Sequence, residues 1–146
     1  MSNLTLRQKE LIEEFSQLNS WENRYKRLIA IGKELPELPE EKKRDDYKVK
    51  GCQSQVWLLA RLDDNKKIQF EADSDAMIVR GLVAILLRVY SDATPDEILS
   101  TPPDFVKEMG FEANLSPSRA NGLISMIRQI MYYATAFRAL LASQQA

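Results

Sequence analysis

The segment from Ala76 to about Tyr90 constrains the fold most, because it is apolar on most of its sides. An ordinary surface helix carries one apolar stripe, whereas a helix of this kind must be covered on several faces. Its longest strongly apolar stretch, Gly81 to Leu87, is far too short to cross a bilayer, which takes about 20 such residues. The pattern therefore predicts a central helix laid across a sheet.

The residues before this helix predict a small antiparallel sheet. Val56 to Leu62 is rich in bulky apolar residues, Asp63-Asp64-Asn65 is a turn signal, and Ile68 to Glu71 is typical of a returning strand. Tyr47 to Val49 is expected to add a short strand. A sheet of two or three short strands needs helices on one face to be stable.

Helix-start signals flank this sheet in the sequence. Ser20 is placed to cap a helix, and Thr94-Pro95-Asp96-Glu97 has the pattern of a capping box with proline at the first position. Asp73-Ser74-Asp75 is interpreted as the cap of the central helix, and Ser116 opens a long last helix. We expect an α+β fold in a single domain over residues 1–146. It has about three antiparallel strands packed against several α-helices and a long C-terminal helix.

Composition and charge exclude several classes of function. The chain is 45% hydrophobic and carries 20 basic and 21 acidic residues, a balance that argues against a nucleic-acid binder. The segment from Met1 to Arg7 lacks the basic region and long apolar segment of a signal peptide. One cysteine and no export signal favour the reducing cytoplasm, with no membrane association.

The absence of histidine removes the usual general base and the commonest metal ligand. Cys–His and Ser–His pairs therefore cannot form within this chain, and Ser54 has no base to activate it. One cysteine without histidine cannot make an ordinary zinc site. The sequence predicts neither a metal nor a cofactor of its own.

Cys52 is the only cysteine, and it stands between Gly51 and the polar run Gln53-Ser54-Gln55. This setting predicts a thiol at the tip of a loop just before a strand. A spectator thiol and a single reactive sulfur both remain open on the residues alone, because its environment decides the reactivity of a thiol.

The run from Gly51 to Trp57 resembles the cysteine loop of the SufE family of sulfur acceptors. Three further blocks resemble signatures of the same family in the same order: Trp21 to Pro39, Asp73 to Leu82 and Leu115 to Leu123. Four blocks in family order are far more specific than a single short motif. The similarity is closer to SufE than to its paralogue CsdE.

The resemblance implies a SufE/IscU-like fold and a role in iron–sulfur cluster assembly. Cys52 would take persulfide sulfur from a SufS-type cysteine desulfurase, stimulate that enzyme, and pass sulfur to a SufBCD-like scaffold complex. The PLP belongs to the desulfurase, so this chain needs no cofactor and is not a self-contained enzyme. The family loop implies an apolar pocket for the cysteine, with Val56, Trp57 and the central helix as walls. A homodimer is compatible with the resemblance.

Arg119 lies in the first turn of the expected last helix, where a cation opposes the helix dipole. The resemblance implies that its guanidinium supports the Cys52 thiolate or persulfide. The alternative is a solvated arginine or an ion pair with Asp73 or Asp75. The residues that we expect to shape the loop or to contact the partner are Gly51, Gln53, Ser54, Gln55 and Asp75.

Three other functions remain alternatives. The first is a CsdE-like acceptor for a paralogous desulfurase. The second is a non-catalytic regulatory module that binds a desulfurase, with Cys52 as a passenger. A thiol redox sensor is the third, but it usually needs a resolving thiol, which this chain lacks.

Overall fold

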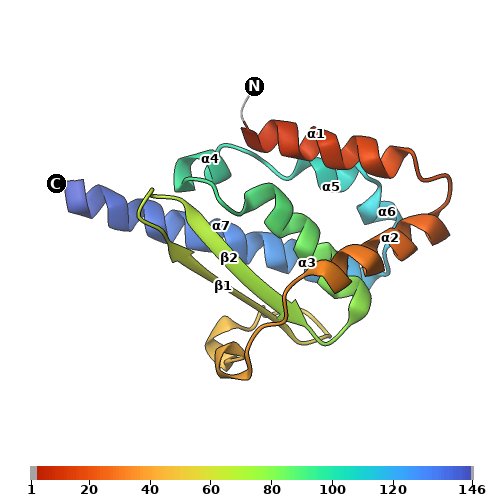
Figure 1. The fold of residues 1–146 in the computed structure, drawn as a ribbon, viewed down its shortest axis with the longest axis horizontal. Helices are drawn as coiled ribbons and strands as arrows, with labels where there is room; N and C mark the ends of the chain where they lie inside the picture. Colours follow the sequence, from red (N-terminus) through yellow and green to blue (C-terminus); the bar gives the residue numbers. More distant parts are fainter. Residues whose placement is uncertain (1–2, 146) are drawn as a thin grey trace.

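The computed structural model describes residues 3–145, drawn as a ribbon in Figure 1. Met1, Ser2 and Ala146, which the expected domain of residues 1–146 includes, lie outside the described residues. The elements in chain order are α1 (Asn3–Ser16), α2 (Trp21–Glu34), the 3-10 turns η1 (Glu40–Lys42) and η2 (Asp45–Tyr47), β1 (Val56–Leu62), β2 (Ile68–Ser74), α3 (Met77–Tyr90), α4 (Pro95–Leu99), α5 (Asp104–Glu108), α6 (Phe111–Asn114) and α7 (Pro117–Gln145).

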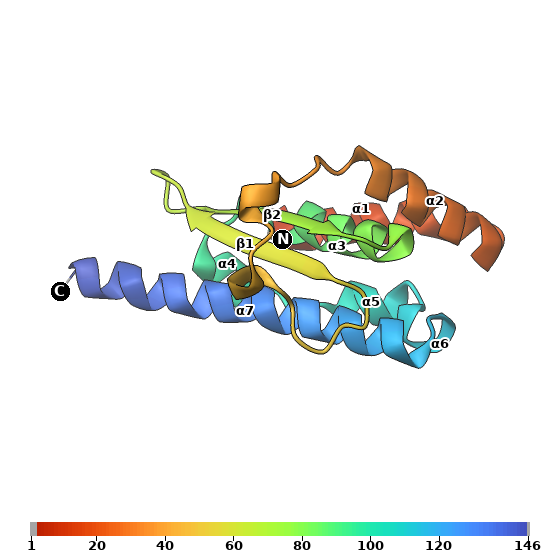
Figure 2. The ribbon, with the colours of Figure 1, turned by 90° about the horizontal axis from the view of Figure 1, so that it is seen from below.

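Helix α3 is the central element, as its sequence predicts. It contacts α1, α2, α7 and strand β2, and most of its side chains are buried. Figure 2 shows α3 between α2 on one side of the molecule and α7 on the other. Burial on several faces is what an all-round apolar helix requires, so the expected α+β fold with a long C-terminal helix is confirmed.

Helices α2 and α3 approach each other at two glycines. A Cβ atom on Gly81 would lie 2.2 Å from the carbonyl oxygen of Leu28, and one on Gly32 would lie 2.8 Å from the backbone nitrogen of Gly81. Only glycine allows two helix backbones to come this close. The glycines at these two positions therefore set how deeply α2 packs onto the central helix.

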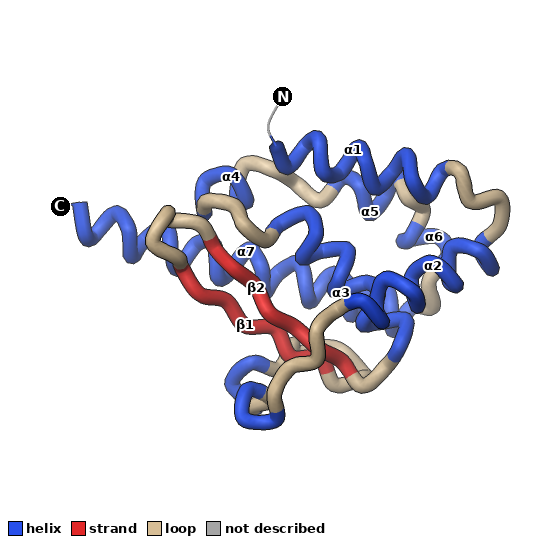
Figure 3. The backbone as a smooth tube through the Cα atoms, viewed as in Figure 1, coloured by secondary structure: helices blue, strands red, loops and turns tan. Residues whose placement is uncertain are grey.

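Within residues 3–145 the sheet has two strands, which lie side by side in Figure 3. They pair antiparallel from Val56 opposite Ser74 to Leu62 opposite Ile68. The third strand expected at Tyr47 to Val49 is reduced to one bridge, between Lys48 and Trp57. The 3-10 turn η2 occupies the chain up to Tyr47, and the turn at Gly51 follows at once, so the ladder has no room to extend.

The expected cap of the central helix is wrong, because β2 continues through Ser74 and the N-cap of α3 is Ala76, with no side-chain hydrogen bond. Asp73 is instead 2% exposed, and its carboxylate accepts hydrogen bonds from the backbone N–H groups of Leu38 (3.0 Å) and Ser74 (2.8 Å). Arg80 and Lys43 form ion pairs with it. A carboxylate held in this way ties the segment after α2, strand β2 and helix α3 together.

The other predicted helix starts are confirmed. The Ser20 side chain accepts a hydrogen bond from the backbone of Asn23, and Thr94 and Glu97 form a capping box at α4. The Ser116 hydroxyl accepts a hydrogen bond from the backbone N–H of Arg119 at the start of α7. Figure 1 shows that the last turns of α7 extend past the sheet.

Candidate functional site

The cysteine loop begins at Gly51, where any residue with a side chain would be strained. Gly51 has a φ of +93°, in the region that side-chain-bearing residues avoid. A Cβ atom there would lie 2.6 Å from the hydroxyl oxygen of Ser125 on α7. Backbone conformation and close packing against α7 both select glycine, and together they direct the next residue, Cys52, toward that helix.

Cys52 is half-buried against the second turn of α7. Its Sγ lies 3.6 Å from the carbonyl oxygen of Gly122, which accepts a weak hydrogen bond from the thiol. A Cβ atom on Gly122 would lie 3.3 Å from this sulfur, so a larger residue at position 122 would crowd it. Gly122 therefore makes the space in which the thiol rests.

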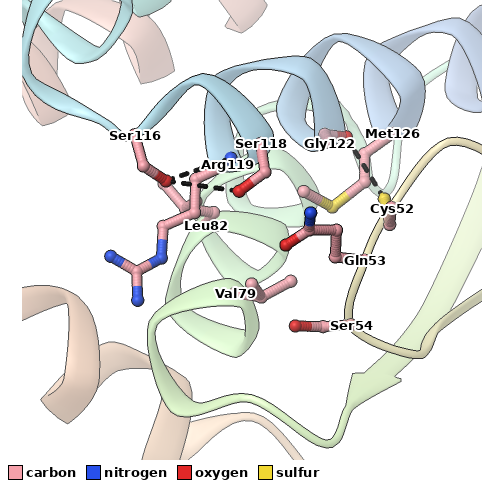
Figure 4. A pocket seen from close by; sticks show the side chains of 10 residues that line it. All are labelled: Cys52, Gln53, Ser54, Val79, Leu82, Ser116, Ser118, Arg119, Gly122 and Met126. Carbon is pink, nitrogen blue, oxygen red and sulfur yellow. Dashed lines mark hydrogen bonds between the residues drawn. The ribbon is translucent and has the colours of Figure 1, made fainter.

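Cys52 lines a cavity of about 340 Å³, shown in Figure 4. Val79 and Leu82 of α3 and Met126 of α7 supply its apolar walls. The polar residues that line it are Gln53, Ser54, Ser116, Ser118 and Arg119. The cavity thus combines apolar side chains, which suit a soft sulfur atom, with hydroxyl, amide and guanidinium groups.

The central helix lines this cavity, as expected, but the other two expected walls do not. Val56 and Trp57 are buried in the sheet region, and Lys43 stacks over the Trp57 ring, with its Nζ 5.4 Å from the ring centroid. Consecutive strand residues point to opposite faces, so Val56 packs into the hydrophobic core while Trp57 packs under Lys43, and neither lines the cavity. Gly122 and Met126, four residues apart on one face of α7, take their place.

The protonation state of Cys52 follows from its surroundings. Burial raises the pKa of the Cys52 thiol above its ordinary value, because the thiolate loses hydration. The carbonyl of Gly122 also accepts from the protonated thiol and offers nothing to a thiolate. In this position the sulfur is a neutral thiol near pH 7, sheltered and weakly nucleophilic.

Arg119 lines the same cavity but does not contact the sulfur. Figure 4 shows its guanidinium pointing away from Cys52, and the side chain is exposed. Among the described residues no carboxylate forms an ion pair with Arg119. Asp73, one of the two expected partners, pairs instead with Arg80 and Lys43. The structure brings Cys52 and Arg119 to one cavity and leaves the guanidinium free at its edge.

Asp75 holds the far end of the cysteine loop. Its carboxylate accepts a hydrogen bond from the backbone N–H of Gln55 at 3.0 Å, and its own N–H donates to the carbonyl oxygen of Gln55 at 3.3 Å. Gln53 and Ser54 lie between this pair and Cys52 and line the cavity. The loop is thus anchored at Gly51 and Gln55, while the residues between these points make few hydrogen bonds.

The sequence predictions missed Met126, Ser116 and Ser118 as cavity residues. Met126 lies one helical turn after Gly122, so the spacing of four residues on the last helix was the available signal. Ser116 and Ser118 were interpreted only as part of a helix start. Their place at the cavity edge depends on how α7 packs, which no local pattern reveals.

Residues 3–145 contain no group of three or more His, Cys, Asp or Glu side chains that could hold a metal ion. In the same part of the chain no helix is long and apolar enough to span a membrane. The fold and the site thus define a small α+β protein in which one half-buried thiol lies beside a cavity.

Comparison with known proteins identifies the family. The profile described as "SufE: Fe-S metabolism associated domain" matches residues 9–134. An uncharacterized SufE-like protein of Rhizobium etli is 46% identical over 125 residues, which cover 83% of this chain and 84% of the relative. One of Synechocystis is 39% identical over 140 residues, covering 94% and 87%. This chain belongs to the SufE family, which supports a role in sulfur transfer with a cysteine desulfurase.

A solved structure agrees with the fold. The solution structure of a hypothetical protein from Thermus thermophilus matches with a TM-score of 0.75. The match covers 91% of this chain and 96% of the other, at 21% sequence identity. At that identity the likeness concerns the fold alone.

Proposed function

We propose that Cys52 accepts sulfane sulfur from a SufS-type cysteine desulfurase and carries it as a persulfide. The Cys52 thiolate attacks the outer sulfur of the desulfurase cysteine persulfide. A new sulfur–sulfur bond forms at Cys52, the old one breaks, and the desulfurase cysteine leaves as thiolate. No electrons are gained or lost overall, so the exchange needs neither an oxidant nor a cofactor on this chain.

The observation that carries the proposal is the cavity beside the sulfur. The terminal sulfur of a Cys52 persulfide has room in this cavity, beside the apolar side chains of Val79, Leu82 and Met126. A passenger thiol would be expected to fill its site without an adjoining space. The cavity supports a carrier that stores a reactive sulfur between two partners.

The neutral resting thiol requires a second position for the exchange. A raised pKa means that the thiolate forms when the loop turns the sulfur out of its burial. The loop is held between its anchors mainly by the weak contact to Gly122, so little free energy opposes this motion. Turned outward, Cys52 meets the polar edge of the cavity, where the unpaired Arg119 guanidinium favours an anionic sulfur.

Removal of the persulfide from the desulfurase frees that enzyme for another turnover, which accounts for stimulation. The family description, with its reference to Fe–S metabolism, supports onward delivery to a SufBCD-like scaffold complex in the cytoplasm. A CsdE-like acceptor of a paralogous desulfurase would use the same residues. In that case the docking surface, and not the cysteine chemistry, selects the partner.

Intact mass spectrometry after incubation with a SufS-type desulfurase and cysteine tests the proposal. The expected result is a gain of about 32 Da, one sulfur atom, on Cys52, which dithiothreitol removes. Cys52→Ser is the matched control and should show no gain. A wild-type protein that takes up no sulfur while the desulfurase is active would show that the proposal is wrong.

The same variant distinguishes a carrier from a regulatory module. If clearing the persulfide causes the stimulation, Cys52→Ser binds the desulfurase but leaves its turnover at the basal rate. Full stimulation by Cys52→Ser would instead favour the module that acts through its surface alone.

A further inference from the structure

A second cavity lies between the segment that leads into the cysteine loop and helix α7. Its volume is about 530 Å³, against about 340 Å³ for the cavity at Cys52, and the two share no lining residue. We call it the basic–aromatic pocket and define it by Lys48, Lys50, Arg128, Tyr132 and Tyr133. Nothing in the sulfur-exchange chemistry of Cys52 uses these side chains.

The charge of this pocket is positive and largely uncompensated. Lys50 and Arg128 are exposed, and no carboxylate among the described residues forms an ion pair with either. Lys48 pairs with Asp45 at 3.2 Å, while the one acidic residue of the lining, Asp46, pairs with Arg44 at 3.4 Å. Two free cations on one small surface favour a negatively charged occupant.

The aromatic part of the pocket includes a tyrosine whose side chain is mostly exposed to solvent. Tyr132 is 71% exposed, the highest value among the exposed large hydrophobic side chains of the described residues. Its ring contacts that of Tyr133 edge to face, with centroids 6.2 Å apart. Exposed tyrosine next to arginine is the composition that protein interfaces favour at their energetic centre.

The floor of the pocket is rigid. The Tyr133 hydroxyl and the Gln129 side-chain amide both donate to the carbonyl oxygen of Leu58, at 2.8 and 2.9 Å. These bonds fasten α7 to strand β1 directly beneath the pocket. The backbone beneath the docking side chains therefore needs no reordering before binding, which lowers the entropic cost of docking.

Helix α7 connects the pocket to the sulfur. Gly122 faces Cys52, Ser125 faces Gly51 and also lines the pocket, and Tyr132 lies farther along the same helix. At 1.5 Å per residue, the distance along the axis from Gly122 to Tyr132 is about 15 Å. A protein anchored in the pocket can therefore present a reactive group to Cys52 at the same time.

We propose that the basic–aromatic pocket docks an acidic peptide segment of the desulfurase that loads Cys52. Its carboxylates meet Lys50 and Arg128, and an apolar or aromatic side chain of the segment packs on Tyr132. This inference rests on the proposed function, because it takes the desulfurase as the sulfur donor. It adds the surface that holds the donor while the cysteine loop moves.

Binding of a catalytically inactive SufS-type desulfurase, measured by calorimetry at low and high salt, tests the proposal without any sulfur transfer. Arg128→Glu should raise the Kd about tenfold at low salt and make it much less salt-dependent, because it reverses one charge of the docking surface. Arg138→Glu is the matched control, since Arg138 is also an exposed arginine of α7, and it should change the Kd less than about twofold. Tyr132→Ala should raise the Kd by an intermediate factor.

Equal effects of Arg128→Glu and Arg138→Glu would overturn the proposal, as would unchanged binding by Tyr132→Ala. Binding of Arg128→Glu to the desulfurase at wild-type affinity, with loss of binding to anionic lipid vesicles or to RNA, would assign the pocket to another occupant and also overturn it. Loading of Cys52 by a small-molecule persulfide should be unchanged in all three variants. A wild-type protein that binds the desulfurase through this pocket but takes no sulfur would refute the proposed function alone.

Discussion

Asp73 and Cys52 lie near the same end of the sheet, and their surroundings are opposite. The Asp73 carboxylate is bound by two backbone N–H groups and two cationic side chains. The Cys52 thiol has a single weak contact, to the carbonyl of Gly122, and an open cavity beside it. A buried charge must be saturated with partners to be tolerated, whereas a neutral thiol can be left with few.

The difference separates a tightly bonded region around Asp73 from a loosely held region around Cys52. Arg80, which pairs with Asp73, also donates hydrogen bonds to the carbonyl oxygens of Gly32 and Leu35, so α2, β2 and α3 form one unit. Displacement of any of these elements would leave a buried charge unpaired. The Cys52 side chain is held only by a weak sulfur contact, which suits the carrier role proposed above.

Among the substitutions that test this comparison, Asp73→Ala should have the largest effect on stability. It removes one member of a buried charged network and leaves Arg80 without its carboxylate, so we expect the free energy of unfolding to fall by about 3–5 kcal/mol. Urea denaturation followed by circular dichroism measures the change. Asp75→Ala removes a neighbouring exposed carboxylate and is the matched control, with an expected loss under about 1 kcal/mol.

A loss of similar size in Asp75→Ala would contradict the contrast between a saturated and a loosely held region. Asp75→Ala should act on the loop instead. It removes the hydrogen bond to the Gln55 N–H, and Cys52 should then react several times faster with iodoacetamide. A reaction rate equal to that of wild type would show that the Asp75–Gln55 pair does not hold the loop.

Gly51→Ala should have the next largest effect, and it should be local. Alanine at a φ of +93° costs about 1–2 kcal/mol, and its Cβ would press on the Ser125 hydroxyl. We expect the loop to leave α7, so that alkylation of Cys52 becomes about tenfold faster, while global stability changes little. Adding Ser125→Ala removes the steric contact and leaves the backbone strain. A double variant with the alkylation rate of wild type would show that the contact alone matters.

The pH dependence of Cys52 should show the smallest effect. Because burial raises the thiol pKa, iodoacetamide alkylation of the folded protein should reach its half-maximal rate at a higher pH than alkylation of free cysteine. Gly51→Ala, which moves the loop outward, should bring the midpoint back toward the ordinary value. A wild-type midpoint below that of free cysteine would mean that the thiol rests beside a positive charge and not in the buried site.

The same shift has a consequence for stability whose sign is fixed. The folded protein holds the thiol proton more tightly than the unfolded chain, so the folded state binds more protons between the ordinary and the raised pKa. The contribution of Cys52 to the free energy of unfolding is therefore full below the ordinary pKa and falls as the pH rises through this window. Cys52→Ser should lack this alkaline decline.

Local patterns were sufficient where local physics decides the structure. The capping box at Thr94, the Ser20 cap and strand β1 were predicted from a few neighbouring residues, since a cap or a short run of bulky apolar residues before a turn depends on residues close in sequence. The predicted cap at Asp73 failed, because the same carboxylate can cap a helix or enter a buried ion pair. Arg80, which α3 brings back onto strand β2, and Lys43, which is distant in sequence, decided between the two.

For the site, the sequence by itself determined that any cysteine chemistry of this chain must use Cys52 without a histidine or a second thiol to assist it. The tertiary structure alone decided that this thiol rests half-buried against Gly122, that the Arg119 guanidinium points away from it, and that a basic–aromatic pocket adjoins the same helix. The identity of a reactive atom is a property of one residue. Its pKa, its shelter and its docking surface come from segments that only the packing of α3 and α7 brings together.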